Sequence, residues 1–315
     1  MTRKKTMLFV VGLAVIGLVA DLRSVALITA AAAEAITPQT SISGDWKATL
    51  VKDDSKINLN FERRTDKGRH GSMGQTYEFS ELGLSREQVI AGGPVKFSLV
   101  REAGTIACEG RFENRKGSGT FTFTPNPSFL SAMKSRGFDF EKENERDNET
   151  DTNDRLFAAA TLNVTTALAD DLVSAGFGKL TVGDLFKAAI FHIDSAFMRE
   201  MKATGFPNLD MEDLVKARIF KIDANFVRQA AQMGLADKGF ESLVKMSIFK
   251  VTPEFVAEVR NAGLTEISIE GIVKLRIFHI DGDFIRKAKS EGVPLNVEQL
   301  VQKKLGVDRV SRRAI

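Results

Sequence analysis

Residues 214–223 read LVKARIFKID, and related stretches recur through the C-terminal half of the chain. The central pair returns at Ile190-Phe191, Ile219-Phe220, Ile248-Phe249 and Ile277-Phe278, each copy 29 residues after the previous one. Phenylalanines, glycines and lysines at other positions follow the same interval. The phenylalanines are Phe197, Phe226, Phe255 and Phe284, and the lysines are Lys187, Lys216, Lys245 and Lys274. So many positions in phase predict a tandem array of structural repeats.

Each repeat has the pattern of two short helices. Thr181 and Asp210 are suited to cap the first helix of their repeats, with an aspartate three residues later to complete a capping box. The second helix has its own cap position, occupied by Asp194, Asp223, Thr252 and Asp281. Pro253 follows Thr252, and proline is favoured at the first position of a helix. A helix pair of this size cannot bury its apolar face alone, so we expect the pairs to stack into an αα solenoid.

Apolar residues at helical spacing predict the core of the repeats. The predicted repeat core comprises Ile190, Phe191, Phe197, Ile219, Phe220, Phe226, Ile248, Phe249, Phe255, Ile277, Phe278 and Phe284. We place the repeat domain at 126–315, including a degraded early copy over 156–176. An acidic insertion at 139–154 carries eight acidic and two basic side chains, which is typical of a solvated, flexible segment.

The region 41–125 has a different periodicity. Apolar and polar residues alternate in six short runs, which is typical of strands with one buried face. With glycine-containing turns between them, these runs predict a small antiparallel β sandwich or barrel. Ser85 and Gln88 form a capping-box pattern that predicts one short helix. The predicted fold class is therefore α+β in two parts, a β-rich domain followed by the helical repeat domain.

Trp46 is predicted to be a core residue that closes one end of the barrel. Gly44-Asp45-Trp46 resembles the G-x-W motif that opens the first strand of lipocalin-type barrels. That resemblance implies, as an alternative, a β domain that carries a ligand. We favour the core role, because the interior of a small barrel is usually filled by its own side chains.

Residues 1–35 have the pattern of an export signal. Basic residues precede the apolar run Met7–Ala20, which is shorter than the roughly 20 residues of a membrane-spanning helix. Small residues at 31–35 offer two A-x-A cleavage patterns. The alternative is an uncleaved anchor, which would have to bury Asp21 and Arg23. We therefore expect an exported protein, periplasmic or extracellular, with the inner membrane reached only through this segment if it stays uncleaved.

Composition excludes several classes of site. The net charge is +3, and no concentrated basic face indicates a nucleic-acid partner. Cys108 is the single cysteine, which excludes an intramolecular disulfide and a multi-cysteine metal site, and its alternating apolar surroundings predict a buried thiol. The sequence has no H-E-x-x-H, G-x-S-x-G, P-loop or dinucleotide motif. We therefore identify no catalytic, metal or cofactor-binding residue and expect no cofactor.

The repeated lysines Lys187, Lys216, Lys245 and Lys274 form a candidate surface ladder, which would suit an anionic polymer of the cell envelope. Glutamates lie four residues before three of these lysines, in the favourable orientation for pairs within one helix. These glutamates are Glu212, Glu241 and Glu270. We favour a salt-bridged, solvated face over an anion track. His192 and His279 share their repeat position with Lys221 and Lys250, so we expect all four to be exposed.

The stretch 214–223 resembles extracytoplasmic segments of bacterial membrane metallopeptidases of the β-lactam-sensor type, and the stretch 117–127 is similar to them too. The peptidase part, with its zinc motif, has no counterpart here, so the resemblance implies a sensor or interaction region without the enzyme. We expect a non-enzymatic scaffold whose solenoid surface binds a protein partner in the cell envelope. The alternatives are a lipocalin-like carrier of a small apolar or anionic ligand and a hydrolase with an unrecognised site.

Overall fold

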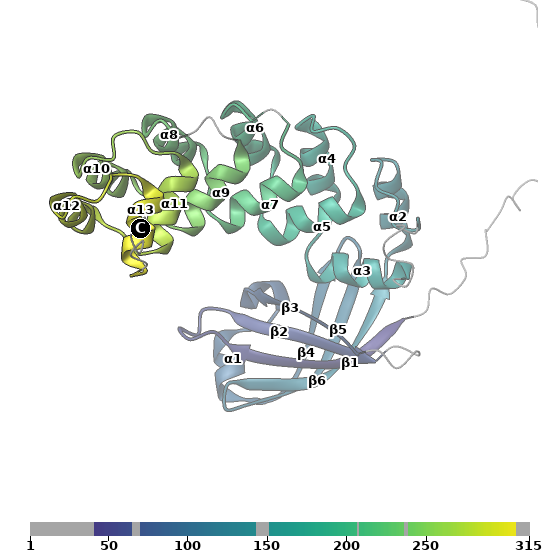
Figure 1. Cartoon of the computed structure of the whole chain (residues 1–315). Coiled ribbons are helices and arrows are strands. Elements are labelled where there is room, and N and C mark those ends of the chain that lie inside the picture. Colours follow the sequence, from purple (N-terminus) through teal and green to yellow (C-terminus); the bar gives the residue numbers. More distant parts are fainter. Residues whose placement is uncertain (1–40, 65–69, 143–150, 207, 236–238, 307–315) are drawn as a thin grey trace, which may run out of the picture. The chain divides into compact units, whose positions relative to one another are not determined.

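The computed structural model describes residues 41–64, 70–142, 151–206, 208–235 and 239–306. These residues form a six-stranded antiparallel sheet followed by a helical part (Figure 1). The α+β, two-part prediction is therefore confirmed at this level. The predicted export signal at 1–35 lies outside the described residues.

The strands form one open sheet in the order β3-β2-β1-β6-β5-β4. They are β1 Ile42–Leu50, β2 Ile57–Arg64, β3 His70–Tyr77, β4 Gly93–Arg101, β5 Gly104–Glu113 and β6 Lys116–Pro125. Between β3 and β4 lie η1 Phe79–Leu82 and α1 Arg86–Ala91, and α1 begins with the predicted capping box of Ser85 and Gln88. The predicted sandwich or barrel is wrong for the described strands, because β3 and β4 are edges that do not pair with each other.

Trp46 is a core residue of this sheet, but it does not close a barrel. Its side chain is fully buried, and its indole N–H donates to the backbone carbonyl of Glu109 at 3.1 Å. The ring extends from β1 across β6 to β5, where only glycine leaves room for it. A Cβ at Gly119 would lie 2.7 Å from the indole nitrogen, and one at Gly110 would lie 2.6 Å from the ring. The two glycines therefore shape the sheet to accept the tryptophan.

Helix α3, Thr152–Thr161, covers the apolar face of the sheet. Phe157 is buried there and stacks on Phe121 with 5.3 Å between the ring centroids. The Tyr77 hydroxyl of β3 also donates to the Thr161 carbonyl at 2.8 Å. The sequence pattern placed α3 in a degraded repeat, whereas its side chains belong to the core of the sheet.

The ends of the predicted acidic insertion are partly packed against the protein, so the expectation of a solvated segment is wrong for Phe140. Phe140 is 1% exposed, and the Asp151 side chain caps α3. Asp154 lies in the first turn of α3 and forms an ion pair with Arg63 of β2. The two ends of the insertion therefore contribute a core side chain and a helix cap. Residues 143–150 lie outside the described part of the chain.

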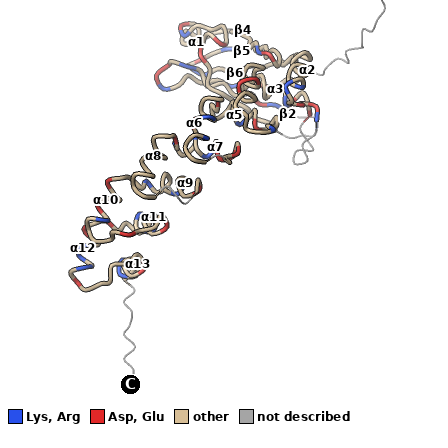
Figure 2. Tube along the Cα trace, turned by 90° about the horizontal axis from the view of Figure 1, so that it is seen from above, with Lys and Arg blue, Asp and Glu red and all other residues tan. Residues whose placement is uncertain are grey.

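The remaining helices lie in two layers (Figures 1 and 2). The odd layer contains α5 Val182–Phe191, α7 Met211–Ile219, α9 Phe240–Ile248, α11 Ile269–Ile277 and α13 Val297–Lys304, and each of these helices contacts the next. The even layer contains α2 Pro127–Lys134, α4 Thr166–Ser174, α6 Ser195–Ala203, α8 Ala224–Gln232, α10 Pro253–Asn261 and α12 Gly282–Ser290. Figure 2 shows basic and acidic residues interspersed along both layers.

The predicted helix caps are confirmed. Thr181 and Asp210 form capping boxes at the starts of α5 and α7. In the even layer, four caps accept a hydrogen bond from the backbone N–H of the phenylalanine three residues later. These caps are Asp194, Asp223, Thr252 and Asp281. Pro253 occupies the first position of α10, where its missing N–H leaves no donor unsatisfied.

A second set of carboxylates joins successive helices of the even layer. Asp171 on α4 accepts from the backbone N–H of Ser195 at 2.7 Å, and Glu258 on α10 accepts from that of Gly282 at 2.7 Å. Glu200 on α6 accepts in the same way from Ala224 at 3.2 Å. Each carboxylate therefore satisfies the first N–H of the next even helix, where a negative charge is favoured.

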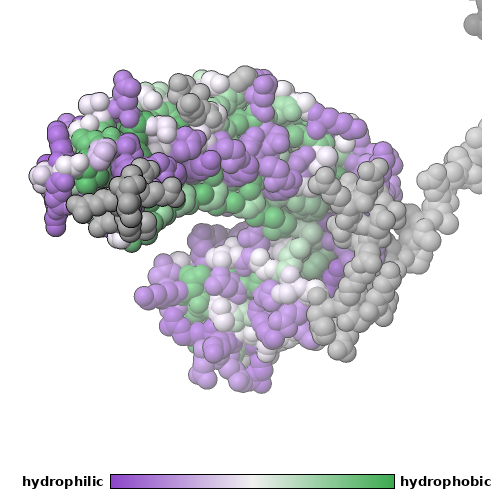
Figure 3. Space-filling view, viewed as in Figure 1, coloured by the Kyte–Doolittle hydropathy of each residue, from purple (hydrophilic) through white to green (hydrophobic). Residues whose placement is uncertain are grey.

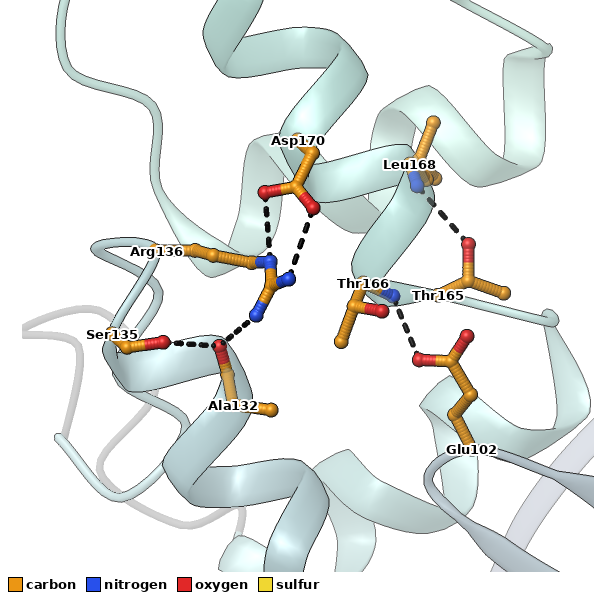
Figure 4. A network of polar contacts seen from close by, with 8 residues as sticks. All are labelled: Glu102, Ala132, Ser135, Arg136, Thr165, Thr166, Leu168 and Asp170. Carbon is orange, nitrogen blue, oxygen red and sulfur yellow. Dashed lines mark hydrogen bonds and ion pairs between the residues drawn. The ribbon is translucent and has the colours of Figure 1, made fainter.

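The sheet supplies the same contact to the start of the helical part (Figure 4). Glu102, in the turn between β4 and β5, accepts from the backbone N–H of Thr166 at 2.9 Å. Arg136, which follows α2, forms a bidentate pair with Asp170 of α4 at 2.8 and 3.0 Å. The first helices of the even layer are thus fixed to the sheet and to each other by charged contacts. We call Glu102, Asp171, Glu200 and Glu258 the bridging carboxylates.

Candidate functional site

Four isoleucines form an exposed row along the odd layer. Ile190, Ile219, Ile248 and Ile277 are 47%, 52%, 47% and 45% exposed, and they lie in the last turn of α5, α7, α9 and α11. We call them the apolar stripe. Figure 3 shows a hydrophobic band along the margin of the helical part where α5, α7 and α9 lie.

The prediction that these isoleucines belong to the repeat core is therefore wrong, for a geometric reason. In α7 the buried residues Leu214 and Ala217 point into the protein. Ile219 comes five residues after Leu214, which at 3.6 residues per turn places it about 140° around the helix from that residue. It therefore lies at the edge of the buried face, in the last turn beyond the buried Val215. Its apolar character predicted burial, but its position on the helix decides exposure.

The phenylalanines of the predicted core do pack against the interior. Phe197 and Phe255 are buried, and the other six are half-buried. The guanidinium of Arg218 lies 3.7 Å from the ring centre of Phe197, and that of Arg276 lies 4.6 Å from that of Phe255. Ser247 holds the corresponding position in the repeat of Phe226, which is half-buried.

Cations without a carboxylate partner flank the apolar stripe. Arg218 donates to the carbonyl of His192 at 2.7 Å, and Arg276 donates to that of Phe249 at 3.1 Å. Lys221 and Lys250 are exposed and have positive φ values of 54° and 51°, which ends α7 and α9. Within the described residues, none of these four side chains forms an ion pair. We call Arg218, Lys221, Lys250 and Arg276 the flanking cations.

The lysine ladder is different, because its charges are largely compensated. Lys187 pairs with Glu212 at 2.5 Å, Lys216 pairs with Glu241, and Lys274 pairs with Glu298 at 2.5 Å. The hydrogen bonds that Lys187 and Lys216 donate to Glu212 and Glu241 raise the pKa values of the two lysines. In the described part of the chain, Lys245 is the member of the ladder without an ion pair.

These ion pairs correct the predicted arrangement of the ladder. The sequence placed each glutamate with the lysine four residues later on its own helix. The structure pairs Glu212 and Glu241 with the lysine of the preceding odd helix. Along their own helices, Lys187 and Lys216 pair instead with Asp184 and Asp213, three residues earlier. The pairs with glutamate therefore connect successive odd helices.

A small cavity lies where the sheet meets α3 and α5. It has a volume of about 240 Å³, and its apolar lining includes Phe61, Met73, Phe157 and Phe186. Arg63 and Asp154 line it too, and their side chains are each 18% exposed. The cavity combines a predominantly apolar wall with one ion pair.

The remaining candidates show no site chemistry. Cys108 is buried, and its burial raises the thiol pKa to about 12, so the thiolate is scarce at neutral pH. His192 and His279 are exposed, as expected. In the ranges that the structure describes, no three His, Cys, Asp or Glu side chains gather as a metal site would require.

Comparisons of the chain with family models, curated proteins and solved structures find no match. Among the described helices, none is by itself long and apolar enough to cross a membrane. Helices α3 and α4 pass that test together, but they are bent by 87° at the break between them.

Proposed function

We propose that this protein is an exported, non-enzymatic interaction protein that binds a protein partner of the cell envelope through the apolar stripe. The observation that carries the proposal is that Ile190, Ile219, Ile248 and Ile277 are exposed at the same place on four successive odd helices. Contiguous apolar surface of this kind on a folded protein commonly marks an interaction site.

The energetics of the stripe suit binding. Full burial of an isoleucine side chain is worth about 1.5–3 kcal/mol, so covering the exposed half of each contributes roughly 1 kcal/mol. Four such side chains supply several kcal/mol before the entropic costs of association. This is enough for a specific contact when the surrounding polar groups also match.

The proposal includes the architecture that presents the stripe. We infer that the helical part is an αα solenoid of 29-residue repeats. The even-layer caps lie at 165, 194, 223, 252 and 281, and each odd helix contacts the next, which supports this inference. A stacked array of helix pairs creates an extended surface on which equivalent residues line up.

The test is crosslinking in the envelope of the protein's own host, with partners identified by mass spectrometry. The variant Ile219→Asn/Ile248→Asn removes the centre of the stripe and should lose the crosslinked partner. Val100→Asn is the matched control, because Val100 is an apolar residue of β4 that is 65% exposed and lies far along the chain from the stripe. Thermal unfolding of both variants checks that they remain folded. An unchanged set of partners in the stripe variant would contradict the proposal.

The cavity favours a second candidate, a carrier that holds a small apolar or anionic ligand. Its volume of about 240 Å³ exceeds the roughly 150 Å³ of an engineered apolar cavity that binds benzene. Native mass spectrometry of the gently purified protein should then show a bound small molecule. Ala158→Leu would fill part of the cavity from α3 and should remove that mass. A native mass equal to that of the protein chain alone would exclude the carrier.

A further inference from the structure

The spacing of the apolar stripe indicates the shape of its occupant. Each stripe residue comes from one odd helix, and α5, α7, α9 and α11 contact each other in order. Axes of packed helices lie about 8–10 Å apart, so successive isoleucines present anchors at about that interval. An α-helix places residues seven apart on one face at about 10.5 Å. An extended strand offers the same face at about 6.6 or 13 Å, which matches less well.

The charge beside the stripe indicates the chemistry of the occupant. Arg218, Lys221, Lys250 and Arg276 have no carboxylate partner among the described residues, and both arginines donate to backbone carbonyls instead. Three of the four ladder lysines earlier on the same helices, Lys187, Lys216 and Lys274, are compensated by glutamates. The flanking cations therefore lie at the ends of α7, α9 and α11, three of the four helices that carry the isoleucines. A binding surface of this sign is complementary to acidic side chains.

We propose that the partner binds as an acidic amphipathic α-helix that lies along the apolar stripe, with apolar residues at seven-residue spacing and Asp or Glu beside them. This inference rests on the proposed function and specifies the partner of the same surface. The stripe is one side chain wide, because the phenylalanine next to each isoleucine packs against the interior. A membrane-binding face is broader than this, which favours a helix over an anionic lipid surface.

The test uses a synthetic, labelled, alanine-based peptide of about 22 residues, long enough to span the four isoleucines. It carries leucine at every seventh position with glutamates beside each leucine. One control peptide replaces the glutamates by lysines, and another shuffles the same composition. Fluorescence anisotropy measures binding to the full chain. We expect the acidic patterned peptide to bind, and both controls to bind at least about tenfold more weakly.

Variants of the protein locate the contact. Ile219→Asn/Ile248→Asn should weaken binding of the acidic peptide at least about tenfold, and Lys221→Glu/Lys250→Glu by a similar factor. Added salt should weaken binding to the wild type more than binding to the lysine variant. Val100→Asn should bind like the wild type.

Several results would overturn the inference. The first is that the acidic peptide fails to bind at concentrations up to about 1 mM. The second is that the shuffled or basic peptide binds as tightly as the acidic one, and the third is that the acidic peptide binds Ile219→Asn/Ile248→Asn as tightly as the wild type. Flotation of the protein with phosphatidylglycerol vesicles, lost in Ile219→Asn/Ile248→Asn, would assign the stripe to a lipid surface instead. If the crosslinked partner depends on the isoleucines but the acidic peptide fails, only this inference falls. If the partner is also unaffected, the proposed function falls with it.

Discussion

Replacing Asp171 by alanine tests how the even layer is held together. The carboxylate accepts hydrogen bonds from the Ser195 backbone N–H at 2.7 Å and from the Ser195 hydroxyl at 2.6 Å. A hydrogen bond to a charged group contributes about 1.5–3 kcal/mol, but Asp171 is half-buried, so water replaces part of the contact in the variant. We expect the free energy of unfolding to fall by about 1–2 kcal/mol. The melting temperature should fall by about 2–6 °C.

The effect of Asp171→Ala depends on pH with a definite sign. The hydrogen bonds from Ser195 hold the pKa of Asp171 below its usual value. A carboxylate whose pKa is lower in the folded state stabilises that state fully above its unfolded pKa of about 4. This stabilisation disappears as the pH falls through the lower, folded-state pKa. The wild type and the variant should therefore differ most at neutral pH and converge in acid.

Thermal unfolding followed by circular dichroism, at about pH 7 and at about pH 3, measures both effects. The matched control is Gln229→Ala. Gln229 holds on α8 the position of the bridging carboxylates, but the next even helix begins with Pro253, which has no N–H to donate. This variant should lower the melting temperature by less than about 1 °C. Equal losses in the two variants, or a loss from Asp171→Ala that is the same at both pH values, would refute the role assigned to the carboxylate.

Three further predictions concern the sheet and the N-terminus. Gly119→Ala should destabilise the protein by about 2–3 kcal/mol in urea unfolding, because the added Cβ would lie 2.0 Å from the Glu109 carbonyl oxygen. The control Gly71→Ala should be nearly neutral, because a Cβ there would lie 3.6 Å from its nearest neighbours. Phe157→Ala should cost about 3–5 kcal/mol by the same assay, because it empties the contact between α3 and the sheet, and a cost below about 1 kcal/mol would place α3 outside that core. Denatured mass spectrometry of the protein from its host should show the loss of residues 1–33 or 1–35, whereas the full mass would favour the uncleaved anchor.

The local features of the fold could be predicted from the sequence. The six strands follow from alternating apolar residues, and the helix starts follow from Thr181, Asp210 and the aspartates of the even layer. Caps and alternation depend on residues only a few positions apart, so their chemistry is complete within a short stretch. Pro253 shows the same independence, since its ring suits the first position of a helix wherever that helix packs.

The candidate site could be predicted only in part. The sequence identified the repeated isoleucines and lysines but misjudged both. It placed the isoleucines in the core, because an apolar residue inside a helical pattern is usually buried. It paired Glu212 with the lysine on its own helix, because the pattern of one sequence does not show that the helix carrying Lys187 packs next to it. The bridging carboxylates were missed for the same reason, although the sequence held one signal. Position 229 is a glutamine instead of an acid in the repeat whose next even helix begins with Pro253.

The sequence by itself determined the class of each element, the helix ends and the 29-residue spacing of its motifs, because these depend on local backbone and side-chain chemistry. Only the tertiary structure decided that the sheet stays open, that Phe157 and α3 cover it, and that Asp171 reaches Ser195 on another helix. It also decided that Ile219 and its equivalents face outward. These outcomes depend on which surfaces meet, and that is settled by the packing of elements far apart in the chain.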